Sequence, residues 1–261
     1  MSWKFVTIEK QGRISIVRFD RGDGRNAMST QLISELTEAA HSFEGDLETS
    51  AIVITGTDKV FSMGYDLKET VPENLGMGEK RLRNQMGPKL CKAWEELEPL
   101  TICAIEGWCI GGGVAFAVPF DLRVAGKSAT LYAPEIERGM NMSWQSVPRT
   151  VNLIGPSRTK RLFVLAERVT AQTAEHWGLV DGVTEDGEAL AGALRFAQRA
   201  AELPPTPLRM IKQGINGAAN ATSNAASFMD ADQNLLNRFS EDFEEGVQSF
   251  LEKRPPSYTG R

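Results

Sequence analysis

Three consecutive glycines, Gly111, Gly112 and Gly113, follow an apolar run in the segment AIEGWCIGGGVAF (104–116). Each glycine costs roughly 1 kcal/mol relative to alanine when the chain becomes ordered, so a triplet needs a physical reason. A backbone without side chains lets a ligand oxygen come within hydrogen-bond reach of the N–H groups. Such amides stabilise an oxyanion, and the loss of one donor typically costs about 3–4 kcal/mol. The alternative is helix–strand packing with no room for a Cβ.

The triplet does not match the common phosphate-binding loops. No Lys-Ser/Thr pair follows Gly113, and the spacing from Gly107 to Gly111 does not fit G-x-G-x-x-G. A second glycine, Gly64 in VFSMGYDLKE (60–69), also ends a segment ahead of backbone that could face a ligand. Together the two segments favour oxyanion binding over simple packing.

Other chemistries are poorly supported by the composition. The chain of 261 residues has two histidines, three cysteines in no CxxC pair, and a formal net charge of −5. We therefore expect no metal site, and no nucleic-acid partner because no overall basic field would recruit one. We also expect a cytoplasmic protein without a membrane partner, since no secretory signal or long apolar run is present.

The elements that must position these residues alternate between strands and helices. Apolar patterns predict strands over 12–20, 51–56, 100–107, 121–126 and 129–133. They predict a helix over 29–43 with Ser29 or Thr30 as its cap, and another over 79–98 with a kink at Pro88. Helical signal resumes at Gly155, where Pro156 suits a first helical position. This alternation indicates an α/β fold.

A change in composition near LPPTPLR (203–209) precedes a tail of almost pure helical signal that is rich in phenylalanine. Its apolar surface must pack on the main domain or on another subunit. We therefore divide the chain into a core, residues 1–199, and a helical oligomerisation region, residues 200–261.

Several segments occur in the order found in one known family. RNAMS, VFSMGYDLKE, EGWCIGGG, YAPEIERG, TAQTAEHWGLVDGV and SEDFEEGVQSFLEKRPPSYTGR closely resemble the crotonase family of enoyl-CoA hydratases, isomerases and relatives. The resemblance runs from about residue 5 to the C-terminus. It implies a spiral of ββα units followed by a helical trimerisation region, a trimer or dimer of trimers, and an acyl-CoA substrate. Coenzyme A would be part of that substrate, with no separate cofactor.

The resemblance also implies roles for individual residues. The backbone N–H groups of Tyr65 and Gly112 would hold the thioester oxygen as it becomes an enolate, with Gly64, Gly111 and Gly113 flanking them. Contacts to the adenine and pantetheine of CoA are expected around Arg25, Asn26 and Ala27, and around Asp66 and Leu67. Phe250 and Lys253 are expected to reach the CoA of a neighbouring subunit.

Two glutamates perform acid–base chemistry in the hydratases of that family, and this chain keeps one of them. The first position is Ala115, whereas the second is Glu135 in APEIERG. Met140, Met142 and Trp144 would raise the pKa of Glu135 by excluding water, and Trp144 and Tyr132 would contact the acyl group. Hydration would need a substitute for the first glutamate, such as Tyr132, Glu137 or Ser143.

One carboxylate can remove a proton and return it elsewhere, so a double-bond isomerase is favoured over a simple hydratase. A hydratase-lyase or hydrolase acting on an aromatic or cyclic acyl-CoA is the main alternative. A non-catalytic acyl-CoA-binding or RNA-binding relative is a further one, and the acidic composition argues against RNA.

Overall fold

The computed structural model describes residues 3–69 and 74–261. Its larger sheet has six strands in the order β1-β2-β3-β5-β7-β10, and β1 pairs antiparallel with β2 while the later pairs are parallel. A smaller sheet has the order β4-β6-β8-β9. The strands are β1 (Val6–Gln11), β2 (Ile14–Phe19), β3 (Ala51–Thr55), β4 (Val60–Ser62), β5 (Leu100–Ile105), β6 (Trp108–Ile110), β7 (Leu122–Gly126), β8 (Thr130–Tyr132), β9 (Val169–Thr170) and β10 (Gly182–Thr184).

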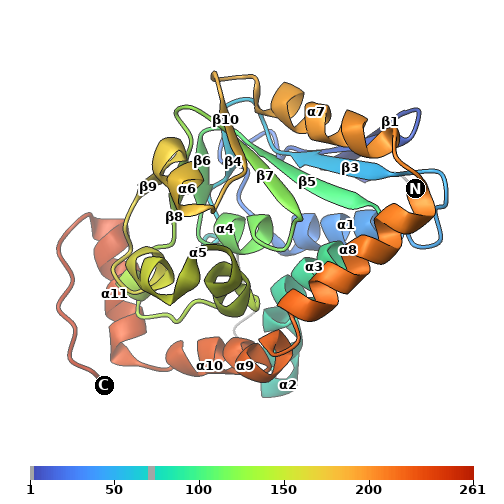
Figure 1. Cartoon of the computed structure of the whole chain (residues 1–261). Coiled ribbons are helices and arrows are strands. Elements are labelled where there is room, and N and C mark those ends of the chain that lie inside the picture. The colour runs from blue at the N-terminus through green and yellow to red at the C-terminus, as the bar shows by residue number, and fades with distance from the viewer. Residues whose placement is uncertain (1–2, 70–73) are drawn as a thin grey trace.

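Helices cover both faces of the larger sheet (Figure 1). The helices are α1 (Thr30–His41), α2 (Met77–Asn84), α3 (Met86–Glu95), α4 (Gly112–Ala117), α5 (Ser146–Phe163), α6 (Ala171–Trp177), α7 (Ala189–Ala201), α8 (Pro205–Ala219), α9 (Ser223–Ser227), α10 (Asp230–Asn237) and α11 (Glu241–Glu252), with a short 3-10 turn at Ile136–Arg138. The α/β class predicted from the sequence is confirmed.

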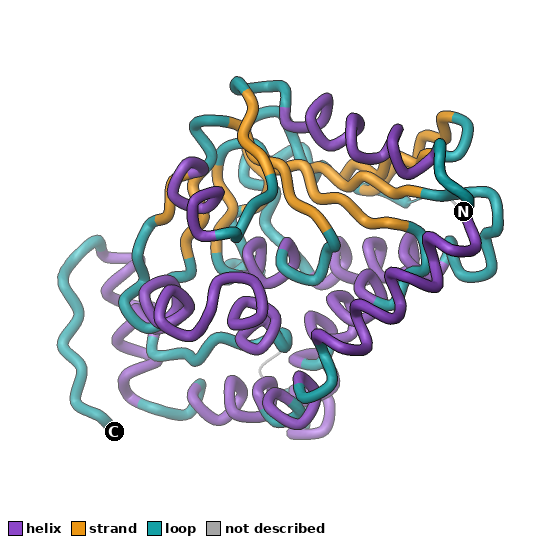
Figure 2. The backbone as a smooth tube through the Cα atoms, in the orientation of Figure 1, coloured by secondary structure: helices purple, strands orange, loops and turns teal. Residues whose placement is uncertain are grey.

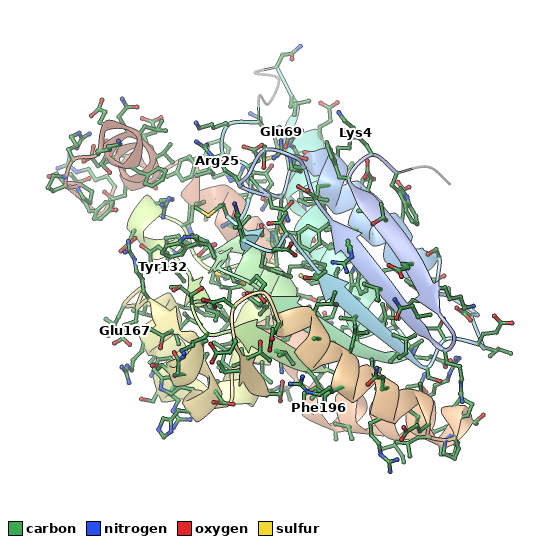
Figure 3. The ribbon with its side chains drawn as sticks, turned by 90° about the horizontal axis from the view of Figure 1, so that it is seen from above. Lys4, Arg25, Glu69, Tyr132, Glu167 and Phe196 are labelled. Atoms are coloured by element: carbon green, nitrogen blue, oxygen red, sulfur yellow. The ribbon has the colours of Figure 1, made fainter. Side chains whose placement is uncertain are left out.

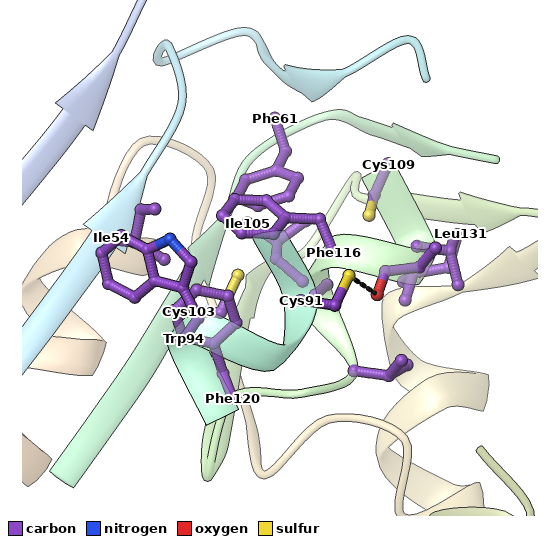
Figure 4. Packing of buried hydrophobic residues seen from close by; sticks show 14 of the residues in the cluster. Ile54, Phe61, Cys91, Trp94, Cys103, Ile105, Cys109, Phe116, Phe120 and Leu131 are labelled. Carbon is purple, nitrogen blue, oxygen red and sulfur yellow. Dashed lines mark hydrogen bonds between the residues drawn. The ribbon is translucent and has the colours of Figure 1, made fainter. Parts of the chain in front are cut away.

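Two hydrophobic cores lie on opposite faces of the larger sheet, because successive strand residues point to opposite sides. Along β3, Ala51 and Val53 pack with the alanine-rich face of α7, whereas Ile52 and Ile54 join the core on the other side. That second core contains a cluster of aromatic rings from α3, α4 and β4 (Figure 4). Burial of each such ring contributes about 1.5–3 kcal/mol.

The cysteines belong to this second core. Cys91, Cys103 and Cys109 are free and buried, and the Cys91 thiol donates to the Ala115 carbonyl at 3.4 Å (Figure 4). Burial raises the pKa of Cys91 to about 12 and raises the pKa of Cys109 well above its ordinary value. Cys103 and Cys109 are thus core thiols.

Most predicted elements are present, with one wrong kink and five strands that were not predicted. Ser29 caps α1 as expected, its Oγ accepting from the Leu32 N–H at 3.2 Å. The predicted kink at Pro88 is wrong, because the chain divides at Gln85 into α2 and α3. Pro88 falls in the first turn of α3, where its missing N–H costs no helical bond. The strands that were not predicted are β1, β4, β6, β9 and β10. In β1 only Val6 is buried, so Val6–Gln11 shows no sustained apolar alternation, and the other four are only two or three residues long.

The C-terminal helices fold back along the molecule. α8 runs diagonally to the edge occupied by α2, α9 and α10 follow that edge, and α11 ends in a tail without helix or strand (Figures 1 and 2). Several large apolar side chains remain exposed on this region: Met210, Ile211, Ile215, Phe228, Leu236, Phe239, Phe250 and Leu251. Assembly through this surface, and the boundary at residue 200, remain predictions. Among the described residues, no helix combines the length and apolarity needed to cross a bilayer.

Candidate active site

A cavity of about 320 Å³ lies between α4, the segment 135–145 and the helices α2 and α10. The sequence-predicted residues Tyr65, Leu67, Gly112, Glu135 and Trp144 all line it. The other lining residues are Thr30, Ile33, Lys80, Arg83, Asn84, Met86, Gly87, Ala115, Met140, Asn141, Met142, Ser143, Asn234, Leu235, Arg238, Phe239 and Phe243. The structure thus brings together the two glycine segments and the glutamate that the sequence singled out separately.

Tyr65 and Gly112 lie next to each other in the cavity lining. A Cβ added to Gly112 would lie 3.2 Å from the Tyr65 nitrogen, so the two residues are in direct contact. Gly112 is the first residue of α4, and the first N–H groups of a helix have no intrahelical acceptor. Within the described part of the chain, neither amide donates to another backbone group. Both are therefore available to a ligand oxygen.

The neighbouring glycines are required by the backbone. Gly64 and Gly111 have φ of +86° and +52°, a region that side chains disfavour. A Cβ at Gly64 would lie 2.7 Å from the Ile110 carbonyl oxygen, and one at Gly111 would lie 2.6 Å from Glu135 Oε1. Gly113 packs against Ser62, where a Cβ would lie 3.0 Å from the carbonyl oxygen. Close packing and an accessible amide therefore coexist in the triplet.

Glu135 follows β8 and precedes the 3-10 turn, with its carboxylate beside Gly111. Its Oε2 is buried and has no hydrogen-bond partner among the described residues. Burial raises the pKa of Glu135 to about 7, against smaller opposing effects from a backbone hydrogen bond and Arg138. A carboxyl group with a pKa near neutrality can both accept and donate a proton at working pH.

The position of the first glutamate of the hydratases is Ala115 in this chain, so it supplies no carboxyl group to the cavity. Ala115 is buried on α4 and lines the cavity with a methyl group. Of the three expected substitutes, Tyr132 donates its hydroxyl to Glu137, and neither residue is among those lining the cavity. Tyr132 instead lies toward the β9 side of the molecule, where Arg168 stacks 5.1 Å from its ring (Figure 3). Ser143 does line the cavity, and its buried Oγ has no partner among the described residues.

Trp144 forms the cavity wall above the triplet. It and Gln145 have left-handed backbones, with φ of +62° and +56°, which non-glycine residues adopt only when their surroundings impose it. Asp230 accepts from the Gln145 N–H at 2.6 Å, and Arg149 donates to the Trp144 carbonyl at 2.9 Å. The indole lies against Gly112, and it occupies the space a side chain at Gly87 would need.

The residues expected to contact CoA hold the loops beside the cavity. The Asn26 side chain donates to the carbonyls of Phe19 and Phe61 at 3.0 and 2.9 Å, and Arg21 pairs with Asp66 at 2.7 Å. Arg25 and Ala27 lie in the same loop, and Arg25 is exposed (Figure 3). Their contacts to CoA remain predictions.

Phe250 and Lys253 lie at the end of α11, outside the cavity lining. The Arg138 guanidinium stacks 4.2 Å from the Phe250 ring, and Lys253 ends the helix with a left-handed φ of +56°. Their predicted contact with a neighbouring subunit's CoA therefore also stays a prediction.

Two lining residues, Arg83 on α2 and Arg238 at the end of α10, were not assigned to the site from the sequence. The charged run RLRNQ (81–85) was the only signal, and it fits a solvated helix face equally well. No sequence signal indicated Arg238, because α10 contacts α2 only through the folding back of the C-terminal helices.

Comparisons with known proteins identify the family of this chain. The family model described as Enoyl-CoA hydratase/isomerase matches residues 9–261. A probable mitochondrial enoyl-CoA hydratase of Dictyostelium discoideum is 30% identical over 97% of this chain and 90% of its own. A short-chain-enoyl-CoA hydratase of Clostridium acetobutylicum is 28% identical over 95% of both chains.

The crystal structure of an enoyl-CoA hydratase/isomerase from Pseudoalteromonas atlantica T6c superposes with a TM-score of 0.88. It is 24% identical and covers 98% of this chain and 100% of its own, a likeness that shows the fold. The expected crotonase-type fold is thereby confirmed.

Proposed function

The chain belongs to the enoyl-CoA hydratase/isomerase family, and from this premise we propose that it shifts a double bond along the acyl chain of an acyl-CoA thioester. Glu135 is the single acid/base, and the amides of Tyr65 and Gly112 form the oxyanion hole. The observation that carries the proposal is that Glu135 is the only carboxylate among the described residues lining the cavity.

In the proposed reaction, the carboxylate of Glu135 removes a proton from the carbon next to the thioester carbonyl of a 3-enoyl-CoA. The electron pair moves onto the carbonyl oxygen, which the Tyr65 and Gly112 amides stabilise as an enolate. Glu135 then returns the same proton to the far carbon of the original double bond, giving a 2-enoyl-CoA. The balance requires no water and no second carboxylate. A pKa of about 7 suits both proton transfers at neutral pH.

Glu135→Gln tests the assignment. We expect turnover of a 3-enoyl-CoA to fall by at least about a hundredfold, the low end for the loss of a general base. Heat stabilisation by the corresponding saturated acyl-CoA should remain, because the amides and the cavity are unchanged. Full turnover in this variant would remove Glu135 from the mechanism.

Hydration is the second candidate, and the names of the relatives favour it. The supporting feature in this chain is Ser143, whose buried, unpartnered hydroxyl could orient a water molecule in the cavity. Crotonyl-CoA, a 3-enoyl-CoA and an aromatic enoyl-CoA would be compared by loss or gain of thioester conjugation. If hydration is the reaction, Ser143→Ala should suppress loss of conjugation in crotonyl-CoA. If isomerisation is the reaction, that substrate should be inert in the unchanged enzyme.

A further inference from the structure

The cavity wall formed by α2 and α10 contains two guanidinium groups. Arg83 and Arg238 both line the cavity that holds Glu135 and Gly112. Arg238 Nη2 donates to Asn84 Oδ1 at 3.3 Å, which fixes the side chain against α2. A largely buried arginine such as Arg238 is costly unless an anion balances it, because an uncompensated buried charge loses its hydration.

Three described carboxylates near this wall already have other partners. Glu69 pairs with Arg83 at 2.9 Å, Asp232 pairs with Arg81 at 2.8 Å, and Asp230 accepts from Gln145. Among the described residues, Arg238 has no carboxylate within ion-pair distance, and its buried Nε has no acceptor. Burial is the main influence lowering the pKa of Arg238, and the Arg83 charge acts in the same direction. Lys80 also lines this wall, so among the described residues both Lys80 and Arg238 lack a carboxylate within ion-pair distance, and Arg238 is the one with a buried, unpartnered nitrogen.

The position of Arg238 indicates which anion would balance it. Its guanidinium lies 5.9 Å from the centroid of the Tyr65 ring, and the amide of that same tyrosine is the proposed donor to the thioester oxygen. Arg238 is thus about one side chain away from the reacting carbonyl. The phosphates of coenzyme A are separated from the thioester by the whole pantetheine arm, so they reach this wall only if the arm folds back.

We propose that the natural acyl group ends in a carboxylate, and that Arg238, supported by Arg83, binds it. The substrate class is then the monothioester of CoA with an unsaturated dicarboxylic acid. This inference rests on the proposed function, because it takes Tyr65 and Gly112 as the site of the thioester. Carboxylates and phosphates share the chemistry that arginine recognises, so the phosphates of CoA are the competing source of the anion.

The first test measures binding without catalysis. Thermal unfolding of the unchanged protein would be followed with adipyl-CoA and with hexanoyl-CoA, which differ only by the terminal carboxylate. We expect about ten- to hundredfold tighter apparent binding of adipyl-CoA, the range for one charge-assisted interaction. Repeating the pair with succinyl-CoA and butanoyl-CoA covers a shorter chain. Equal binding within both pairs would overturn the proposal, even if no turnover is ever detected.

The second test uses variants and turnover. Arg238→Met should abolish the preference for 3-hexenedioyl-CoA over 3-hexenoyl-CoA, measured as a ratio of kcat/KM, and Arg238→Lys should restore part of it. Arg81→Met, on the same helix as Arg83 but outside the cavity lining and paired with Asp232, is the matched control and should keep the preference. If Arg238→Met weakens both substrates equally, and weakens free CoA as well, the arginine binds a CoA phosphate and the proposal is wrong. If the unchanged protein converts neither substrate yet binds adipyl-CoA preferentially, the proposed reaction fails while the anion site stands.

Discussion

Replacing Glu135 with glutamine should change the stability of the protein in a pH-dependent way. Folding raises the pKa of this carboxyl from 4.5 to about 7. Between these values the folded protein holds a proton that the unfolded chain releases, so the free energy of unfolding decreases as the pH rises through this window. The loss is complete above about pH 7, where the buried group is ionised. Glutamine has no proton to lose, and the variant lacks this contribution.

The size of the effect follows from the pKa values. A shift from 4.5 to about 7 corresponds to about 3 kcal/mol when fully developed, at 1.36 kcal/mol for each unit. By the same linkage, ionisation of Glu135 lowers the free energy of unfolding of the unchanged protein by about 1 kcal/mol at pH 5 and by about 3 kcal/mol at pH 8. From pH 5 to pH 8, the free energy of unfolding of the variant should therefore rise by about 2 kcal/mol relative to that of the unchanged protein. Glutamine also places an amide N–H donor where Glu135 Oε2 has no partner. This changes the free energy of unfolding of the variant by the same amount at both pH values.

Urea unfolding at pH 5 and pH 8, followed by tryptophan fluorescence at a fixed protein concentration, measures this change. Glu175→Gln removes an exposed carboxylate on α6 and serves as the control for the loss of one negative charge. A difference between Glu135→Gln and the unchanged protein that is equal at both pH values would refute the reasoning. So would a difference that shrinks as the pH rises.

Three further outcomes follow from the packing. Gly12→Ala should cost about 1–2 kcal/mol in urea unfolding through its φ of +60° alone, and Gly64→Ala should cost more because its Cβ also meets the backbone at 2.7 Å. Gly87→Ala should raise the KM for acyl-CoA by displacing Trp144, whereas Gly78→Ala, with open space around it, should leave KM unchanged and stabilise by up to about 1 kcal/mol. Light scattering at micromolar concentration should give a trimer or hexamer, and a monomer would contradict the role of the exposed C-terminal face.

The glycine half of the site could be predicted from the sequence because its physical requirements select residue types. A positive φ and a close contact require glycine at positions 64 and 111, so the requirement is visible in the sequence as the residue type. The serine that caps α1 is likewise a residue type selected by its local structure. Glu135 could be located only through the family resemblance, since a single glutamate has no local pattern that separates catalysis from solvent exposure.

The cavity wall formed by α2 and α10 could not be predicted, because its residues come from distant segments of the chain. Arg83 and Arg238 meet through the folding back of α8 to α10, which no local periodicity encodes. The left-handed turn at Trp144 and Gln145 is likewise held by Asp230 and Arg149, and neither residue type at the turn indicates such a backbone. The break at Gln85 shows the same limit, since nothing in its residue type marks a helix end.

The contact between Gly87 and Trp144 has a consequence for how the acyl pocket can change. A larger residue at position 87 has no space while the indole is present, and a smaller residue at position 144 leaves a gap over Gly112. Mutations at these two positions are therefore epistatic, and new acyl selectivities become accessible when both change together. A library that randomises positions 87 and 144 jointly should yield altered specificities that saturation of either position alone misses.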